Sequence, residues 1–196
     1  IRERGWSFLW EAIPRLLGSN YDNSDGTRDY IRDFLIDQEI SFRSIKRWAS
    51  KNDADYLSIT SINDSKAEKY LNSESPQWLV YSGGGILREN IIHSMSGRVL
   101  NAHQGPLPEV RGMNAAEWSI LLDEKQETTI HLVDKGIDTG KIVISLPYAI
   151  EENDTINSLR HKAKIKGIEG LVEVASRNDL SDFNLGENNS VYRQCY

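Results

Sequence analysis

Two side chains that can exchange protons lie two positions apart in the stretch NAHQGPLPEVRG, residues 101–112. Asn101 and His103 come at the end of RVLNAH (98–103), a run whose apolar residues predict a strand. Because side chains alternate between the two faces of a strand, Asn101 and His103 share one face. A histidine can take or give a proton near neutral pH, and an amide can donate to a developing oxyanion.

Two further segments could complete such a site. The loop VDKGIDTGK (133–141) contains Asp134 and Asp138 between glycines, and SGGGILRE (82–89) follows a predicted buried strand. A nearby carboxylate can orient a histidine or raise its pKa. In open α/β sheets ligands bind beyond the carboxyl ends of the strands, where we place all three segments. Together they suit attack of a nucleophile on a carbonyl carbon, with no metal required.

Each of these features also has a purely structural interpretation. A single histidine at a strand end, such as His103, is more often a hydrogen-bond partner than a catalyst. His131, on the predicted strand TTIHLVD (128–134), either packs against neighbours or borders the site. The glycine run at 83–85 has neither the G-x-G-x-x-G spacing of a dinucleotide site nor the Lys-Ser/Thr of a phosphate loop. Only the combination of segments favours a catalytic function.

Hydrophobic periodicity predicts the elements that would position these segments. We expect strands at 55–60, 77–82, 98–103, 128–134 and 141–150, and helices at 6–17, 27–40, 64–73, 83–95, 112–124 and 155–175. This alternation predicts an α/β protein with an open, mostly parallel twisted sheet and helices on both faces. The first two strands would form a β-α-β unit. We expect residues 1–50 to be a helical N-terminal segment and residues 51–196 to be the catalytic domain.

Composition narrows the classes of partner. The formal net charge is −6 and no long Lys/Arg stripe is present, so we expect no nucleic-acid partner. No apolar run approaches the roughly 20 residues of a membrane span, so we expect no membrane partner. The single cysteine, Cys195, provides neither a disulfide framework nor a cysteine metal cluster, which favours a cytoplasmic location. Because the chain begins at Ile1 rather than Met, we expect further residues to precede it.

NAHQGPLPEVRG and TTIHLVDKGIDTG together resemble a known signature: Asn-x-His, Leu-Pro-x-x-Arg-Gly, Thr-x-His and Asp-x-Gly, in this order, in the folate-dependent formyltransferases. The resemblance covers residues 77–150. It implies a Rossmann-like formyltransferase fold and transfer of a formyl group from 10-formyltetrahydrofolate to an amine. It assigns the catalytic roles to Asn101, His103 and Asp138, and it implies that the carboxylate beside His103 favours a protonated ring.

The resemblance also implies which residues bind the folate. GGGILRE is similar to the segment whose backbone contacts the pterin in that family. The folate-binding residues so assigned are Gly85, Ile86, Leu87, Arg88, Val133, Asp134, Gly136 and Ile137.

The acceptor is less well specified, because Gln104 and Gly105 stand where many members have other residues after the histidine. A small-molecule amine such as an amino sugar nucleotide is our leading expectation, since the chain is acidic and ends at Tyr196 without a further tRNA-binding domain. Formyltetrahydrofolate hydrolysis, glycinamide ribonucleotide or methionyl-tRNA as acceptor, and a non-catalytic folate-binding module stay open. A coincidental match on a flavodoxin-like domain and a homodimer also stay open.

Overall fold

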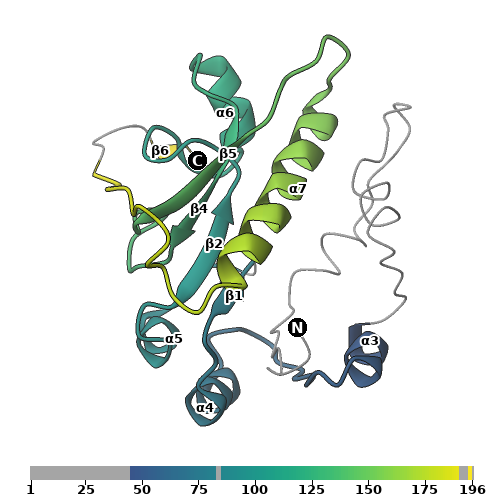
Figure 1. The fold of residues 1–196 in the computed structure, drawn as a ribbon, viewed down its shortest axis with the longest axis vertical. Helices are drawn as coiled ribbons and strands as arrows, with labels where there is room; N and C mark the ends of the chain where they lie inside the picture. The colour runs from purple at the N-terminus through teal and green to yellow at the C-terminus, as the bar shows by residue number, and fades with distance from the viewer. Residues whose placement is uncertain (1–44, 83–84, 190–193, 196) are drawn as a thin grey trace.

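Figure 1 shows the computed structural model of the chain, which describes residues 45–82, 85–189 and 194–195. The predicted helices at 6–17 and 27–40 lie outside the described residues. Within the predicted N-terminal segment, the structure describes the start of helix α3 (Ile45–Lys51). The division of the chain at residue 50 stays a prediction.

Four strands form one open sheet in the order β1-β2-β4-β5. Their bounds are Leu79–Tyr81, Val99–His103, Glu127–Leu132 and Ile142–Pro147. Helix α5 (Glu89–Ser94) connects β1 to β2, which run parallel, whereas β4 runs antiparallel to both β2 and β5. The predicted open α/β sheet is confirmed, but in the described residues it is mixed rather than mostly parallel. Residues 133–141 join β4 to β5, and this connection is shorter than the crossover of about a dozen residues that parallel strands need.

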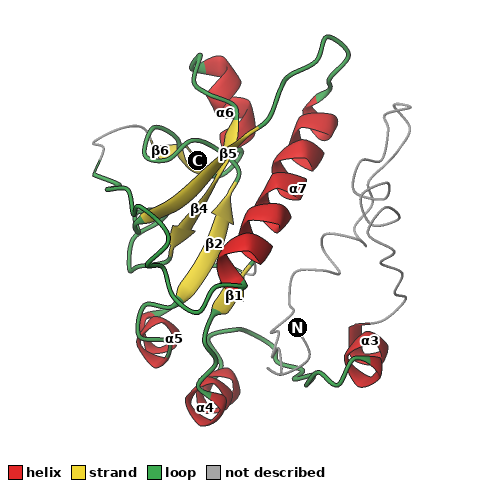
Figure 2. Ribbon diagram, in the orientation of Figure 1, coloured by secondary structure: helices red, strands yellow, loops and turns green. Residues whose placement is uncertain are grey.

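Helices cover both faces of this sheet, as predicted (Figure 2). Helix α7 (Ile156–Ala175) lies on one face, where its Leu171 and Val174 pack against a cluster that includes Leu100 and Ile130. Helices α4 (Ser65–Glu74) and α5 lie on the other face and pack on the alternate strand residues, among them Leu79 and Val99. Strands β1 and β2 therefore contribute to two separate hydrophobic clusters.

Local sequence signals explain the two longest helices. Helix α4 begins after Asp64, whose side chain accepts a hydrogen bond from the backbone of Lys66 at 2.8 Å. Helix α7 begins after Thr155, which forms a reciprocal capping box with Ser158. Gly167 lets α7 lie close to the sheet, because a Cβ there would be 3.0 Å from the Cβ of Ala102 on β2. The predicted helices at 64–73 and 155–175 are confirmed.

The predicted strand at 55–60 is wrong, and with it the first β-α-β unit. These residues are irregular and largely exposed, and Tyr56 is 46% exposed. Among the described residues, β1 pairs with β2 alone, so no ladder forms on the other edge of β1. Apolar alternation predicts a strand only where a partner supplies hydrogen bonds. The β-α-β unit of the structure is instead β1-α5-β2.

The remaining elements lie around the carboxyl end of β2. Helix α6 (Ala115–Leu121) lies within the predicted 112–124 helix. The short strand β3 (Arg111–Gly112) pairs in parallel with β6 (Gln194–Cys195), a small second sheet that the sequence did not predict. Of the helices in the described part of the chain, none combines the length and the apolar character that a bilayer crossing requires.

Candidate active site

Strand β2 presents Asn101 and His103 on the sheet face opposite α7. Leu100, before Asn101, and Ala102, between Asn101 and His103, pack toward α7. Alternation along the strand therefore turns Asn101 and His103 to the other face. Strand β1 ends at Tyr81, opposite Asn101, so β2 extends past it and borders a cleft. The predicted shared face is confirmed.

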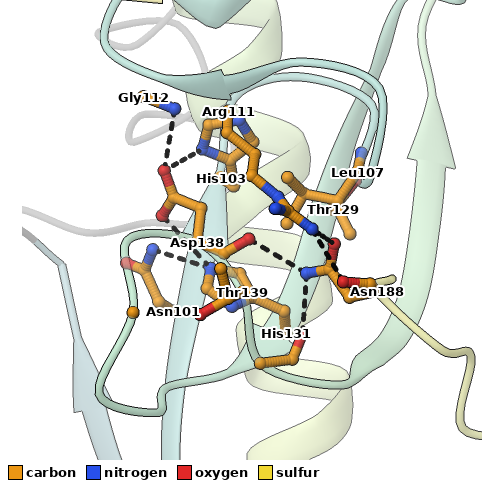
Figure 3. A network of polar contacts seen from close by, with 12 residues as sticks. Asn101, His103, Leu107, Arg111, Gly112, Thr129, His131, Asp138, Thr139 and Asn188 are labelled. Carbon is orange, nitrogen blue, oxygen red and sulfur yellow. Dashed lines mark hydrogen bonds and ion pairs between the residues drawn. The ribbon is translucent and has the colours of Figure 1, made fainter. Parts of the chain in front are cut away.

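The loop 133–141 reaches the same face by a route that the sequence did not predict. Strand β4 is antiparallel to β2 and pairs Leu132 with Leu100, so β4 ends near the start of β2. The loop then folds back along the face and brings Asp138 beside His103 (Figure 3). All three segments are predicted from the sequence to lie beyond the carboxyl ends of the strands at one edge of the sheet. This prediction is wrong for the loop 133–141, because the antiparallel β4 ends at the opposite edge.

Polar contacts and close packing determine the shape of this loop. The side chain of Asp134 accepts hydrogen bonds from the backbone of Gly136 at 3.0 Å and from the Thr139 hydroxyl at 2.5 Å. Asp138 itself has a φ of 53°, in the left-handed region. Gly140 lies so near the carbonyl oxygen of Leu132 that an added Cβ would collide with it.

The carboxylate of Asp138 lies between two histidines. Its Oδ2 accepts a hydrogen bond from the backbone N–H of Gly112 at 3.0 Å and is 3.4 Å from Nδ1 of His103. Its Oδ1 is 3.7 Å from Nε2 of His131. Both histidines are buried, with His103 5% exposed and His131 2% exposed. His131 therefore borders the site, which is one of the two interpretations that its sequence position allowed.

Backbone carbonyls determine which nitrogen of each histidine carries a proton. Nε2 of His103 donates to the carbonyl of Val110 at 2.8 Å, because a carbonyl can only accept. The other nitrogen of His103, Nδ1, then faces Asp138 with a lone pair when the ring is neutral. Nδ1 of His131 donates to the carbonyl of Leu132 at 2.8 Å, so its Nε2 accepts from Nδ2 of Asn101 at 3.1 Å.

Burial dominates the protonation of both rings. Burial lowers the pKa of His103 below its ordinary value, although the charge of Asp138 and the bond to Val110 act to raise it. Burial likewise lowers the pKa of His131. Asp138 thus favours a protonated His103, as expected, but burial opposes this effect and lowers the pKa of the ring overall. The geometry instead holds a neutral ring beside a carboxylate that can stabilise an added proton.

Strand β4, whose Thr129 pairs with His103, holds the proline-containing loop 104–110 in place. The buried hydroxyl of Thr129, on β4, donates to the carbonyl of Gly105 at 2.8 Å and accepts from the N–H of Leu107 at 3.2 Å. The same loop supplies the Val110 carbonyl that bonds His103. The predicted Thr-x-His strand thus contributes one residue to loop anchoring and one to the polar network.

These residues border a cleft of about 660 Å³. All three predicted catalytic residues line it, and so do seven of the eight predicted folate-binding residues: Gly85, Ile86, Leu87, Val133, Asp134, Gly136 and Ile137. Ile86 and Ile137 are 71% and 43% exposed, so each presents a large apolar side chain to solvent from one side of the cleft. Such exposed apolar residues at a cleft are typical of ligand-binding surfaces.

Arg88 is the predicted folate-binding residue that does not line the cleft. Its backbone N–H donates to the side-chain oxygen of Asn63 at 2.8 Å, and the Asn63 amide donates to the carbonyl of Ile86 at 2.8 Å. Asn63, just before α4, therefore holds the 86–88 backbone in place. No motif surrounds Asn63 in the sequence, so local patterns did not predict its role.

Gln104 and Gly105, the two positions at which the loop departs from the expected signature, have different environments. Gln104 lines the cleft, whereas Gly105 packs under α6, where a Cβ would come within 2.7 Å of the Ala115 Cβ. Beyond Gln104 the cleft is bordered by Glu117 of α6, which accepts a hydrogen bond from Nε of Arg160 on α7 at 2.6 Å. A polar rim thus lies next to the predicted catalytic residues.

The described ranges contain no group of three or more His, Cys, Asp and Glu side chains arranged to hold a metal ion. The arrangement of Asn101, His103 and Asp138 instead provides an amide donor, a neutral imidazole and a carboxylate on one cleft wall. These groups can donate to an oxyanion and relay a proton.

A sequence model of the formyl transferase family matches residues 34–175, more than half of the chain. The chain belongs to the formyl transferase family. The match extends on both sides of residues 77–150, to which the motifs had confined the resemblance. The methionyl-tRNA formyltransferase of Caldanaerobacter subterraneus subsp. tengcongensis is 31% identical to this chain over 173 residues. The alignment covers 87% of this chain and 56% of the relative. The chain spans about half the length of the curated relatives it matches.

Solved structures of formyltransferases share the fold. A formyltransferase from Anoxybacillus kamchatkensis, in complex with UDP-4,6-dideoxy-4-formamido-L-AltNAc and tetrahydrofolate, aligns with a TM-score of 0.53 at 22% identity, covering 86% of this chain and 82% of that one. An N-formyltransferase from Helicobacter canadensis, with folinic acid and dTDP-3-aminofucose, aligns with a TM-score of 0.56 at 20% identity, covering 78% of this chain and 54% of that one.

The candidate site of this formyl transferase also includes two signature residues that had no predicted role, and Asn188, which no sequence pattern singled out. Arg111, the arginine of the expected signature, donates from Nη2 to the backbone and side-chain oxygens of Asn188 at 2.7 and 2.8 Å. Gly112 supplies the N–H that binds Asp138. Asn188 follows α7 in a polar stretch that carries no periodicity or motif, so only the folded structure brings it to the site.

Proposed function

We propose that this chain catalyses transfer of a formyl group from 10-formyltetrahydrofolate to an amine. The observation that carries the proposal is the convergence of Asn101 and His103 from β2, and Asp138 from the β4-β5 loop, on one wall of the cleft. Membership of the formyl transferase family supports the same reaction class.

10-Formyltetrahydrofolate supplies the formyl group, and tetrahydrofolate leaves as its nitrogen gains a proton. The new bond joins the acceptor nitrogen to the formyl carbon, the bond to the folate nitrogen breaks, and one proton passes from the amine to that nitrogen. Asn101 has two N–H bonds, of which one is donated to His131, so the other can donate to the oxyanion. His103 takes up charge at Nδ1, and Asp138 stabilises that charge and helps move the proton.

Apolar residues on two segments of the cleft support the binding of a flat folate ring. Ile86 and Leu87 lie on one side, and Val133 and Ile137 lie on the loop that carries Asp138. We assign folate binding to these residues together with Gly85, Asp134 and Gly136. In this assignment Asp134 acts through its loop, because its carboxylate already accepts from two groups within that loop.

An amino sugar nucleotide is our first candidate for the acceptor. Two solved formyltransferases of this fold contain sugar nucleotides, and the polar rim next to Gln104 offers hydrogen-bond partners for a small polar amine. Methionyl-tRNA is the second candidate, because the curated relatives are methionyl-tRNA formyltransferases. That observation reopens the nucleic-acid partner that the acidic composition had disfavoured. A cytoplasmic location and a homodimer stay part of the proposal, the latter to be checked by light scattering.

The proposal is tested by incubating the purified chain with 10-formyltetrahydrofolate and either amino sugar nucleotides or methionyl-tRNA. We expect mass spectrometry to show one acceptor gaining the mass of CO, and the H103A variant to lose that product. Formate release without any amine would identify a hydrolase instead. Folate binding with neither product nor formate would identify a non-catalytic folate-binding module and overturn the proposal.

A further inference from the structure

Asn188 joins two segments of the site that are far apart in sequence. It lies after α7, is 6% exposed, and follows Gly186, whose backbone pairs with Ile142 at the start of β5. Its side-chain amide donates to the backbone carbonyls of Asp138 and Gly140 at 2.9 and 2.8 Å. Figure 3 shows the hydrogen bonds of Asn188 to Asp138 and to Arg111.

The opposite side of Asn188 accepts from Arg111. Nη2 of Arg111 donates to the side-chain oxygen of Asn188 at 2.8 Å and to its backbone oxygen at 2.7 Å. The next residue, Gly112, donates its N–H to the carboxylate of Asp138. Asp138 is therefore held at two points, its backbone by Asn188 and its carboxylate by the segment that Asn188 also binds.

The backbone of Asp138 needs such support. Its φ of 53° lies in the left-handed region, which costs a residue with a side chain roughly 1 kcal/mol or more. Among side chains of this size, only an amide offers two N–H donors and an acceptor at once. An aspartate at position 188 would keep the acceptor for Arg111 and lose both donors to the loop.

We propose that Asn188 is a positioning residue that holds Asp138 in place beside His103. The inference rests on the proposed function only for its effect on turnover, because the placement of Asp138 can be measured without turnover. Asn188 touches neither of the predicted catalytic side chains on β2 and acts through the backbone of the aspartate loop.

The test compares N188A and N188D with N189A, a control at the neighbouring exposed residue, whose amide donates to Glu187. We expect the formyl-transfer rate to fall about 10- to 100-fold in N188A, because small misplacements of catalytic groups cost this much. N188D should fall as far, since it too lacks the donors, and N189A should stay near the wild-type rate. A wild-type rate in N188D would overturn the inference.

The decisive readout is the pKa of the His103 ring, followed by NMR in wild type, D138N and N188A. The charge of Asp138 acts to raise this pKa, so it should drop in D138N and drop in the same direction in N188A. An unchanged His103 pKa in N188A would overturn the inference, even if the rate falls.

Full activity of D138N would instead overturn the catalytic role of Asp138 and leave the NMR comparison valid. If N188A does not fold, the formyl-transfer rates of N188D, D138N and the double variant N188D/D138N are compared. A double variant whose loss of rate is the product of the two single losses would overturn the inference.

Discussion

The two halves of the candidate site are held in place in different ways. Asn101, His103 and His131 lie on β2 and β4, neighbouring strands whose backbone ladder and buried faces determine their positions. Asp138 lies in a loop with a left-handed backbone, and side-chain contacts and one close glycine hold it there. We infer that changes in the residues that support the strand half, such as Thr129, will mainly reduce stability, and that changes in the loop half will mainly reduce activity.

The largest expected effect is that of D138N. Asparagine keeps the size of the side chain and an oxygen for the Gly112 N–H, but it loses the charge. We expect kcat to fall about 10²- to 10⁴-fold, the range typical of a lost acid-base group, with about 1 kcal/mol or less of lost stability. Steady-state kinetics and urea unfolding measure the two quantities. A large loss of stability with an unchanged rate would reverse the comparison.

G140A tests the loop half without touching a reacting group. Its Cβ would collide with the Leu132 carbonyl, so the loop must shift and move Asp138. We expect kcat to fall about 10- to 100-fold. The matched control is G186A, where a Cβ would be 3.4 Å from the Cβ of Ile142, an ordinary contact. Equal rates for G140A and G186A would show that the loop shape does not matter.

T129V tests the strand half. Valine preserves the shape but removes the hydroxyl, which leaves the Gly105 carbonyl and the Leu107 N–H unpaired and buried. We expect a loss of about 1–3 kcal/mol in the free energy of unfolding, measured with urea, and a smaller loss of rate than in G140A. T129S, which keeps the hydroxyl, is the control and should lose less. A T129V protein as stable as wild type would refute the strand half of the comparison.

The smallest expected effect is the pH dependence of stability. Burial lowers the pKa of His103 and His131, so below about pH 6.5 the unfolded chain takes up protons that the folded chain does not. Their contribution to stability is therefore present above that pH and is lost as the pH falls, by at most about 1.4 kcal/mol per pH unit for each ring. Urea unfolding of wild type and H103Q should give a flatter curve for the variant. Parallel curves would contradict a neutral, buried His103.

Local patterns predicted the strand half of the site better than the loop half. Alternation along a strand is a local property, so the shared face of Asn101 and His103 followed from their spacing alone. The position of Asp138 depends on β4 being antiparallel to β2, which is a pairing between distant segments. The protonation of His103 depends on burial by the whole fold, and the contacts of Asn188 depend on where the chain returns after α7. No local pattern contains that information.

The strand half and the loop half should act as one unit in catalysis, and a double-mutant cycle on formyl transfer tests this most directly. The rates of wild type, H103A, D138N and the double variant are compared with the same acceptor. If His103 and Asp138 share one proton-transfer function, the double variant should be about as slow as the slower single variant. Losses that multiply in the double variant would mean that the two residues act independently, and would contradict the account.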